Sequence, residues 1–377
     1  MRAERKKEWF ILGVLLIYIG IVPIMSEDYA TSWSKTFGGP QDDYCFGGQQ
    51  TNDGGFILWG ATFSKEPNKE DAWLLKIDAE GNKKWDKTFG GKDRMWMLSA
   101  QLTRDDGYIL APNLGIGSPE KRYAILIKTD SNGTEIWNRT IGGPFITDAG
   151  GAWSVRETTD GGYILVGNNG AGGWVVKTNS NGTEVWNKTF NVMSKPGTSN
   201  VLRCVRETHS GDYIIAGQAT GVGWLLKIDS KGNILWEKTF ENSAQFRSVE
   251  ETSDGGYLLT QASTDIRVIK TDLNGNVIWD KTFGGPNEDQ AYSAVEVTGG
   301  YLIIGDTKSY GSGKFDIWLI KLDRNGNKIW DKTFGGAGDD SGKYAQGTSD
   351  GGCIIMGQTT SYGTGKLDAW LIKLNLK

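Results

Sequence analysis

Residues 279–283 read WDKTF, and this motif indicates the fold because it occurs, with small variations, seven times along the chain. The copies begin at Trp33, Trp85, Trp137, Trp186, Trp236, Trp279 and Trp330, at intervals of 52, 52, 49, 50, 43 and 51 residues. Such a period is typical of a four-stranded propeller blade rather than of a helical or leucine-rich repeat. The repeat therefore predicts an all-β protein, a β-propeller with seven blades.

Each repeat divides into four predicted strands. In the sixth repeat these are residues 291–298, 300–307, 315–323 and 327–334, where aromatic and β-branched residues are common and polar and apolar residues often alternate. Sequences such as SDGG separate the first strand from the second, and sequences such as DRNGN separate the third from the fourth. Gly and Asn accept the positive φ that tight hairpins require, so the strands of a blade are expected to be antiparallel.

The two ends of the chain predict how the ring closes. The last repeat ends with LDAWLIKLNLK, residues 367–377, and therefore lacks its own WDKTF strand. The missing strand occurs near the start of the chain, where residues 32–39 read SWSKTFGG. We therefore expect Trp33–Phe37 to form the outer strand of blade seven, which leaves no blade unfinished and limits exposed sheet edges.

Composition excludes several classes of protein. A net charge of -4 argues against a nucleic-acid binder. The single histidine, His209, lies where other repeats carry turn residues, and it is predicted to be a turn residue. Cys45, Cys204 and Cys353 lie far apart in no CxxC pattern, which argues against a zinc site and favours small buried side chains in strands.

The first 26 residues differ from the rest of the chain. A basic start, MRAERKKE, precedes the uncharged apolar run Trp9–Met25, which is typical of a signal peptide or an N-terminal membrane anchor. Either would place the propeller, residues 27–377, outside the cytoplasm, secreted or anchored to the cell membrane. Four candidate glycosylation sequons are compatible with that location: Asn132, Asn138, Asn181 and Asn187.

The repeats also resemble a known family. Residues 334–374 contain a GGAGDD opening, a DGG turn, a GQTTS segment and the strand DAWLIKL, and these elements resemble the SBBP-type β-propeller repeat of bacterial and archaeal surface proteins. The resemblance covers residues 31–377 and is clearest in blades one, six and seven, whereas blades three to five lack the double Asp and the Tyr-Gly loop. It implies a cell-surface propeller and brings no catalytic residues with it.

Acidic residues gather in the crossovers that lead from an outer strand to the next inner strand. Together with tyrosines on the long loops between second and third strands, they predict a ligand-binding face on the neighbouring blades six, seven and one. Carboxylates beside Gly-rich loops suit Ca²⁺, for which Asp43 and Asp340 are the candidate ligands, and Tyr beside carboxylates suits a sugar. The alternative is that each Asp caps a turn. The candidate residues are Asp42, Asp43, Glu288, Asp289, Tyr310, Asp339, Asp340 and Tyr362.

Three functions fit this sequence. The first is a binding module, a monomeric domain that holds a surface protein or glycan with no cofactor other than Ca²⁺. The second is an enzyme, either a glycosidase or lyase using a carboxylate pair such as Asp43 and Asp340, or a protein similar to quinone-dependent dehydrogenases. The third is a structural surface scaffold. We favour the binding module and expect no enzymatic activity, because the sequence shows no nucleophile with a paired base.

Overall fold

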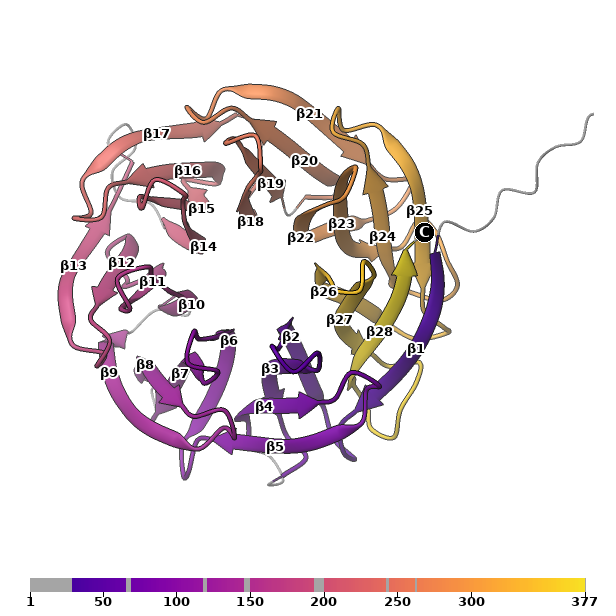
Figure 1. The fold of residues 1–377 in the computed structure, drawn as a ribbon, viewed down its shortest axis with the longest axis horizontal. Coiled ribbons are helices and arrows are strands. Elements are labelled where there is room, and N and C mark those ends of the chain that lie inside the picture. The colour runs from indigo at the N-terminus through magenta and orange to yellow at the C-terminus, as the bar shows by residue number, and fades with distance from the viewer. Residues whose placement is uncertain are drawn as a thin grey trace, which may run out of the picture.

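The computed structural model describes residues 29–65, 69–117, 121–145, 150–192, 200–241, 244–261 and 263–376. These residues form seven four-stranded antiparallel sheets arranged as blades around a central axis (Figure 1). The described residues contain no helix, and none of them forms a helical segment that could cross a membrane. The prediction of an all-β, seven-bladed propeller is therefore confirmed. The segment 1–26 lies outside the described residues, so its role as a signal or anchor stays a prediction.

Every blade runs from an inner strand at the axis to an outer strand at the rim (Figure 1). Blades one to four comprise β2 (Asp43–Gln50), β3 (Phe56–Thr62), β4 (Asp71–Ile77) and β5 (Lys83–Phe89); β6 (Arg94–Leu102), β7 (Tyr108–Ile116), β8 (Lys121–Thr129) and β9 (Glu135–Phe145); β10 (Gly151–Glu157), β11 (Tyr163–Asn168), β12 (Gly173–Thr178) and β13 (Glu184–Phe190); and β14 (Val201–Glu207), β15 (Tyr213–Ala219), β16 (Val222–Ile228) and β17 (Ile234–Phe240). Blades five to seven comprise β18 (Phe246–Glu251), β19 (Tyr257–Gln261), β20 (Ile266–Thr271) and β21 (Val277–Phe283); β22 (Asp289–Val297), β23 (Gly300–Thr307), β24 (Asp316–Leu322) and β25 (Lys328–Phe334); and β26 (Asp340–Gly347), β27 (Cys353–Thr359) and β28 (Asp368–Leu376), completed by β1 (Tyr29–Phe37).

The N-terminal strand closes the ring as the sequence predicts. β1 pairs antiparallel with β28, from Tyr29 opposite Leu376 to Phe37 opposite Ala369, and the two lie side by side at the rim (Figure 1). The ring of Tyr29 also packs on Trp330 of blade six, with the ring centroids 5.2 Å apart. Blade seven therefore joins the two ends of the chain, and the closure is confirmed.

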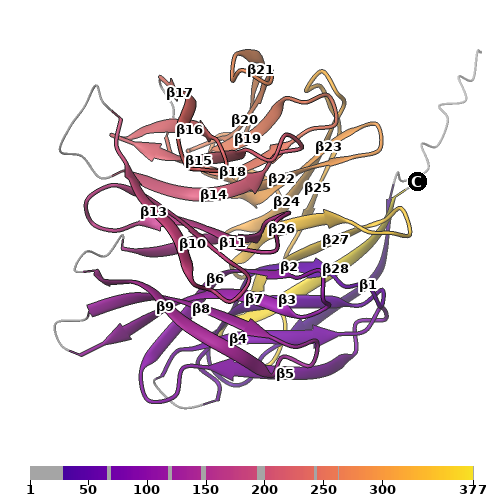
Figure 2. The same cartoon turned by 60° about the vertical axis from the view of Figure 1, so that its left-hand side comes forward.

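Aromatic residues of the outer strands join one blade to the next. The outer-strand Trp of a blade lies against the glycine in the third turn of the following blade; Trp279, for example, lies against Gly326. The stem of Lys281 lies against the same glycine, as expected for a lysine that covers apolar surface with its methylenes. Trp318 and Trp370, from third strands, are buried in the apolar layers between blades. The stacked blades are visible in the turned view of Figure 2.

The turns named in the sequence take the expected places. His209 is an exposed turn residue, and its Nδ1 lies 2.7 Å from Oε2 of Glu251 in the next blade. The three cysteines are free and buried. Both predictions, a turn position for His209 and burial for the cysteines, agree with the structure.

A buried lysine ties the third strand of most blades to the turn between the first and second strands. In blade five, Lys270 is 2% exposed, and its Nζ donates to Asp254 Oδ1 at 2.9 Å and to the Thr271 carbonyl at 2.9 Å. Partial burial alone would raise the pKa of Asp254, but hydrogen bonds from Thr252, Lys270 and the Gly256 amide lower it to about 2. The charged pair therefore stabilises the turn wherever this aspartate is ionised.

We expect Asp254→Asn to destabilise the protein by about 1–3 kcal/mol at pH 7, because Lys270 remains charged and buried without its carboxylate. Since the folded pKa lies below the ordinary value of about 4, the contribution of Asp254 is full above that value and is lost as the pH falls towards 2. Urea unfolding at several pH values measures both effects. Glu80→Gln removes an exposed turn carboxylate and serves as the control. Equal stability of Asp254→Asn and wild type at pH 7 would contradict this role.

Candidate ligand-binding channel

The inner strands carry the side chains that face the axis. Each inner strand has a β-bulge, a point where its register against the second strand shifts, for example between Leu202 and Cys204. A bulge leaves an extra residue and re-aims its side chain. In all seven blades the extra residues line one central cavity of about 720 Å³, and we call this set the bulge ring: Phe46, Leu98, Ser99, Trp153, Arg203, Arg247, Tyr292 and Lys343.

A glycine in the second strand makes room for the bulge in five of the blades. A Cβ on Gly217, opposite Leu202, would lie 2.0 Å from the carbonyl oxygen of Val201, closer than real atoms approach. The same position is held by Gly60, Gly167, Gly305 and Gly357. These glycines let the second strand approach the inner strand while the bulge residue points to the axis.

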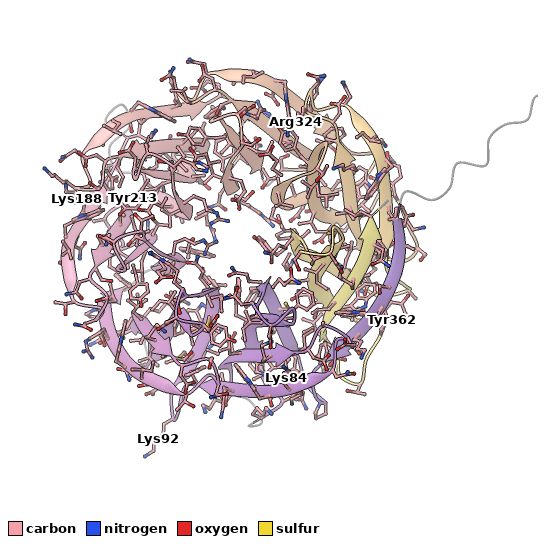
Figure 3. The ribbon with its side chains drawn as sticks, viewed as in Figure 1. Lys84, Lys92, Lys188, Tyr213, Arg324 and Tyr362 are labelled. Atoms are coloured by element: carbon pink, nitrogen blue, oxygen red, sulfur yellow. The ribbon has the colours of Figure 1, made fainter. Side chains whose placement is uncertain are left out.

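Cations and aromatic rings contact one another in blades three to seven of the bulge ring. The guanidinium of Arg203 lies 3.4 Å from the ring centroid of Trp153, and that of Arg247 lies 4.2 Å from that of Tyr292. Lys343 approaches the same Tyr292 ring from the next blade, with Nζ 3.7 Å from the centroid. Side chains of the inner strands project into the centre of the ring in Figure 3. Cation–π contacts of this kind hold Arg203 and Arg247 in place without neutralising them, whereas Lys343 also forms an ion pair with Asp306 at 3.8 Å.

A second layer of charge lies beside the bulge ring. Arg206 forms an ion pair with Glu250, while Arg156 donates to Ser99 Oγ and to its neighbouring carbonyl at Val155. Among the described residues no carboxylate forms an ion pair with Arg156, Arg203 or Arg247. The cavity therefore presents more fixed positive charge than its own acids balance.

Burial and mutual repulsion act on these cations. Desolvation, followed by the charge of Arg247, lowers the pKa of Arg203 to about 10. Desolvation and the charge of Arg206 also lower the pKa of Arg156. Both groups remain protonated at neutral pH, so an anion entering the cavity would relieve a real electrostatic penalty.

Sequence reasoning missed the bulge ring, although one signal was present. The turn residues and the Trp of each blade are copied from repeat to repeat, whereas the bulge column reads Phe, Leu-Ser, Trp, Arg, Arg, Tyr and Lys. A position that varies within a strict repeat does not serve the structural role that the recurring turn and Trp positions serve in every blade. Only the bulge, which the strand pattern does not reveal, turns that column towards the axis.

The predicted acidic residues occupy two different environments. The second Asp of the crossover is buried in blades one, six and seven, with exposed fractions of 1%, 0% and 0% for Asp43, Asp289 and Asp340. Asp43 accepts hydrogen bonds from Thr62 Oγ1, from Ser64 Oγ at 2.7 Å and from the Gly39 amide at 2.6 Å. Asp289 and Asp340 accept the same three kinds of hydrogen bond in their own blades. These carboxylates tie the crossover to the loop between the second and third strands.

The first acid of each crossover lies at the surface. Glu288 pairs with Lys308 at 2.9 Å, and this contact lowers the pKa of Glu288. Asp339 pairs with Lys314 at 3.3 Å, and the backbone of Asp42 forms a β-bridge with Leu367, just before β28 of blade seven. These residues are available to solvent on the loop face.

The two predicted tyrosines are exposed but anchored. Tyr310 and Tyr362 are 45% and 47% exposed, and their hydroxyls donate to the Gly284 and Gly335 carbonyls at 2.9 and 2.8 Å. Each ring packs on the third-strand Trp of its blade, at 5.0 and 5.1 Å between centroids. Figure 3 shows Tyr362 beside β1, well away from the axis. The loop face and the central channel are therefore separate surfaces.

Asp43 and Asp340, which the sequence analysis proposed as a pair, each lie near a different aspartate in the structure. Asp43 lies near Asp368 at the seam of blades seven and one, and Asp340 lies near Asp316 at the seam of blades six and seven. Each of Asp43 and Asp340 thus faces a third-strand aspartate that sequence reasoning did not single out. Within the described residues, no three His, Cys, Asp or Glu side chains converge as a metal-binding group.

The comparisons with known proteins agree with this architecture. Residues 124–359 match the family described as outer membrane protein assembly factor BamB. The chain belongs to the BamB family. No curated protein matches the sequence significantly.

Solved structures similar to this BamB-family propeller support its fold. A catalytically inactive virginiamycin B lyase from Staphylococcus aureus, with quinupristin, is 9% identical and has a TM-score of 0.60, with coverage of 90% of this chain and 99% of that chain. The Dos1 propeller is 12% identical and has a TM-score of 0.52, with coverage of 84% and 75%. At these identities the likeness concerns the fold alone.

Proposed function

We propose that this BamB-family propeller is a binding module whose central channel takes an acidic segment of a partner protein. The observation that carries the proposal is the bulge ring, in which Arg203 and Arg247 are held by aromatic rings and have no carboxylate partner among the described residues. Arginine beside aromatic rings is enriched at the centres of protein interfaces. The carboxylates of such a segment would pair with Arg203 and Arg247, and its apolar atoms would contact the aromatic rings of the bulge ring.

The size and rigidity of the channel support a binding role. About 720 Å³ falls within the range of specific ligand sites, and side chains from all seven inner strands line it. The lining residues stand on strands rather than on loops, so the site is organised before a ligand arrives. The family description, an assembly factor, supports a partner protein rather than a small substrate.

We also propose a location outside the cytoplasm. The basic and apolar start of the chain supports it, as does the outer-membrane description of the family. The four sequon asparagines are all exposed, as glycosylation requires, and their glycosylation stays a prediction. The repeat features of blades one, six and seven support a relation to the SBBP-type surface propellers within this proposal.

Binding of a fluorescent hexaglutamate peptide tests whether the channel takes an acidic segment. Arg203→Gln combined with Arg247→Gln is expected to weaken its binding at least about tenfold, because two desolvated cations each contribute charge-assisted hydrogen bonds. Fluorescence anisotropy at low and high salt measures the change. Arg139→Gln, on an outer strand, is the matched control. Equal binding by wild type and the double variant, or equal binding of hexalysine, would refute an acidic-segment site.

A second candidate function is glycan binding on the loop face of blades six, seven and one. The observation that favours it is the pair of exposed tyrosines, Tyr310 and Tyr362, in blades whose crossovers also carry the surface acids Glu288 and Asp339. A glycan panel distinguishes the two candidates, because Tyr310→Ala with Tyr362→Ala would remove glycan binding and leave hexaglutamate binding intact. We propose binding rather than catalysis or a purely structural scaffold for both surfaces.

A further inference from the structure

Two buried carboxylates each have one oxygen without a hydrogen-bond partner. Asp368 and Asp316 begin the third strands of blades seven and six, and they are only 1% and 2% exposed. Asp368 Oδ2 accepts from the Thr364 and Gly365 amides at 2.8 and 2.9 Å, and Asp316 Oδ2 accepts from the Ser312 amide at 2.5 Å. Oδ1 accepts no hydrogen bond in either residue. A buried charge left unsatisfied in this way is costly, and here the feature occurs twice in the same place.

Each of these oxygens faces a second carboxylate across a blade seam. A Cβ on Gly38 would lie 2.0 Å from Asp368 Oδ1 and 2.7 Å from Asp43 Oδ2. At the other seam, a Cβ on Gly335 would lie 1.6 Å from Asp316 Oδ1 and 2.9 Å from Asp340 Oδ2. Two carboxylate oxygens that share so small a space repel each other unless positive charge lies between or beside them.

Backbone carbonyl oxygens add to the same space. Near Gly365, the position of a Cβ would be 2.4 Å from the Gly39 oxygen, 2.6 Å from the Gln41 oxygen and 3.3 Å from Asp368 Oδ1. Near Gly313, the corresponding position is 2.3 Å from the Gly336 oxygen and 3.0 Å from the Ala337 oxygen. A cavity of about 360 Å³ adjoins Asp43 and Asp368 at the seam of blades seven and one. Lys65 and Lys83 also line this cavity, but each forms an ion pair with Asp86, so the oxygens of Asp43 and Asp368 have neither lysine as an ion-pair partner.

In blade one, the aspartate equivalent to Asp316 and Asp368 has a different loop sequence before it. This aspartate is Asp71, at the start of β4, and the loop before it lacks the Tyr-Gly sequence of blades six and seven. There, Nζ of Lys69 lies 2.9 Å from Asp71 Oδ1. Asp71 Oδ1 accepts no hydrogen bond, like Oδ1 of Asp316 and Asp368, but in blade one a lysine of the chain forms an ion pair with it.

From these observations we propose that the seams of blades six/seven and seven/one each bind a divalent cation, Ca²⁺ in preference to Mg²⁺. One site uses Asp316 and Asp340 with carbonyls of residues 336–337, and the other uses Asp368 and Asp43 with carbonyls of Gly39 and Gln41. Oxygen-only donor sets that mix carboxylates with irregularly placed backbone carbonyls suit the larger, more flexible coordination of Ca²⁺. Because the two carboxylates of each site come from different blades, the cations join blade seven to both of its neighbours.

A shared proton is the competing explanation for facing carboxylates. Burial, with the charge of Asp340, raises the pKa of Asp316. A proton would satisfy one oxygen, but it would leave the carbonyls of Gly39 and Gln41 without a role. The two explanations also differ in what stabilises the protein, which is added Ca²⁺ in one case and lower pH in the other.

The test is thermal unfolding of the propeller in EDTA and in millimolar CaCl2 or MgCl2, with calorimetric titration of CaCl2. We expect CaCl2 to raise the Tm by at least about 3 °C over EDTA. MgCl2 should have a smaller effect, and titration should give two Ca²⁺ per chain. Asp316→Asn with Asp368→Asn should abolish the shift, and either single variant should halve the stoichiometry. In EDTA these variants are expected to be at least as stable as wild type, since a neutral amide replaces an unsatisfied charge.

Asp229→Asn removes the same charge from an exposed turn of blade four and should keep the full response. An identical Tm in CaCl2 and EDTA, or a Ca²⁺ shift that survives in the double variant, would overturn the proposal. Stability that rises from pH 7 to pH 5 without any Ca²⁺ effect would assign the pairs to a shared proton instead. The hexaglutamate assay is independent of this outcome, because the channel residues take no part in either seam.

Discussion

Removal of β1, residues 29–37, is expected to lower the free energy of unfolding by at least about 3 kcal/mol, because it takes the outer strand from blade seven. The strand supplies the whole β1–β28 ladder, and Ser34 Oγ accepts the indole hydrogen bond of Trp370 at 2.8 Å. Trp33 and Phe37 also pack on the apolar layer between blades seven and one. Denaturant unfolding measures the loss, and hydrogen exchange should show it first in β28, whose edge becomes exposed.

A chain that starts at residue 29 is the control for this deletion, because it keeps the complete strand. Trp33→Ala should fall between the two, since it retains the backbone ladder but loses apolar contact and the hydrogen bond from Nε1 to the Ala79 carbonyl. A deletion variant that unfolds in one cooperative transition at the wild-type midpoint would show that β1 does not close the ring energetically.

Gly217→Ala is expected to destabilise the propeller by about 2–4 kcal/mol, although it adds a single methyl group. That methyl would lie 2.0 Å from the Val201 oxygen and 2.9 Å from the Leu202 Cα, and both are backbone atoms that cannot rotate away. The inner strand must shift, and the bulge at Arg203 shifts with it. We therefore expect weaker hexaglutamate binding as well as a lower Tm.

The matched control is Gly221→Ala in the nearby turn of the same blade. Gly221 has a φ of 85°, and nothing lies within 4 Å of its would-be Cβ, so only conformational strain of about 1–2 kcal/mol is expected. Wild-type binding is expected for this variant. If Gly217→Ala were no more harmful than Gly221→Ala, the close approach of the two strands would have no energetic importance.

The blade count, the strand order and the closure by residues 33–37 could all be predicted from the amino-acid sequence. This prediction is possible because a repeat of about 50 residues displays each turn and each core position seven times, so local chemistry and global topology agree. The same repetition made the acids of the crossovers conspicuous. The repetition did not reveal their structural role. Asp43, Asp289 and Asp340 recur because each ties the crossover to the loop between the second and third strands.

Which residues share a site depends on the folded structure and could not be predicted from the repeat. A β-bulge in each inner strand turns residues to the axis, and in five blades a glycine in the paired strand makes room for it. Asp43 and Asp368 are 325 positions apart and meet only because the ring closes between blades seven and one. Contacts across seams and across the axis depend on how the blades pack against one another. A pattern that repeats within each blade carries no information about the distances between residues of different blades.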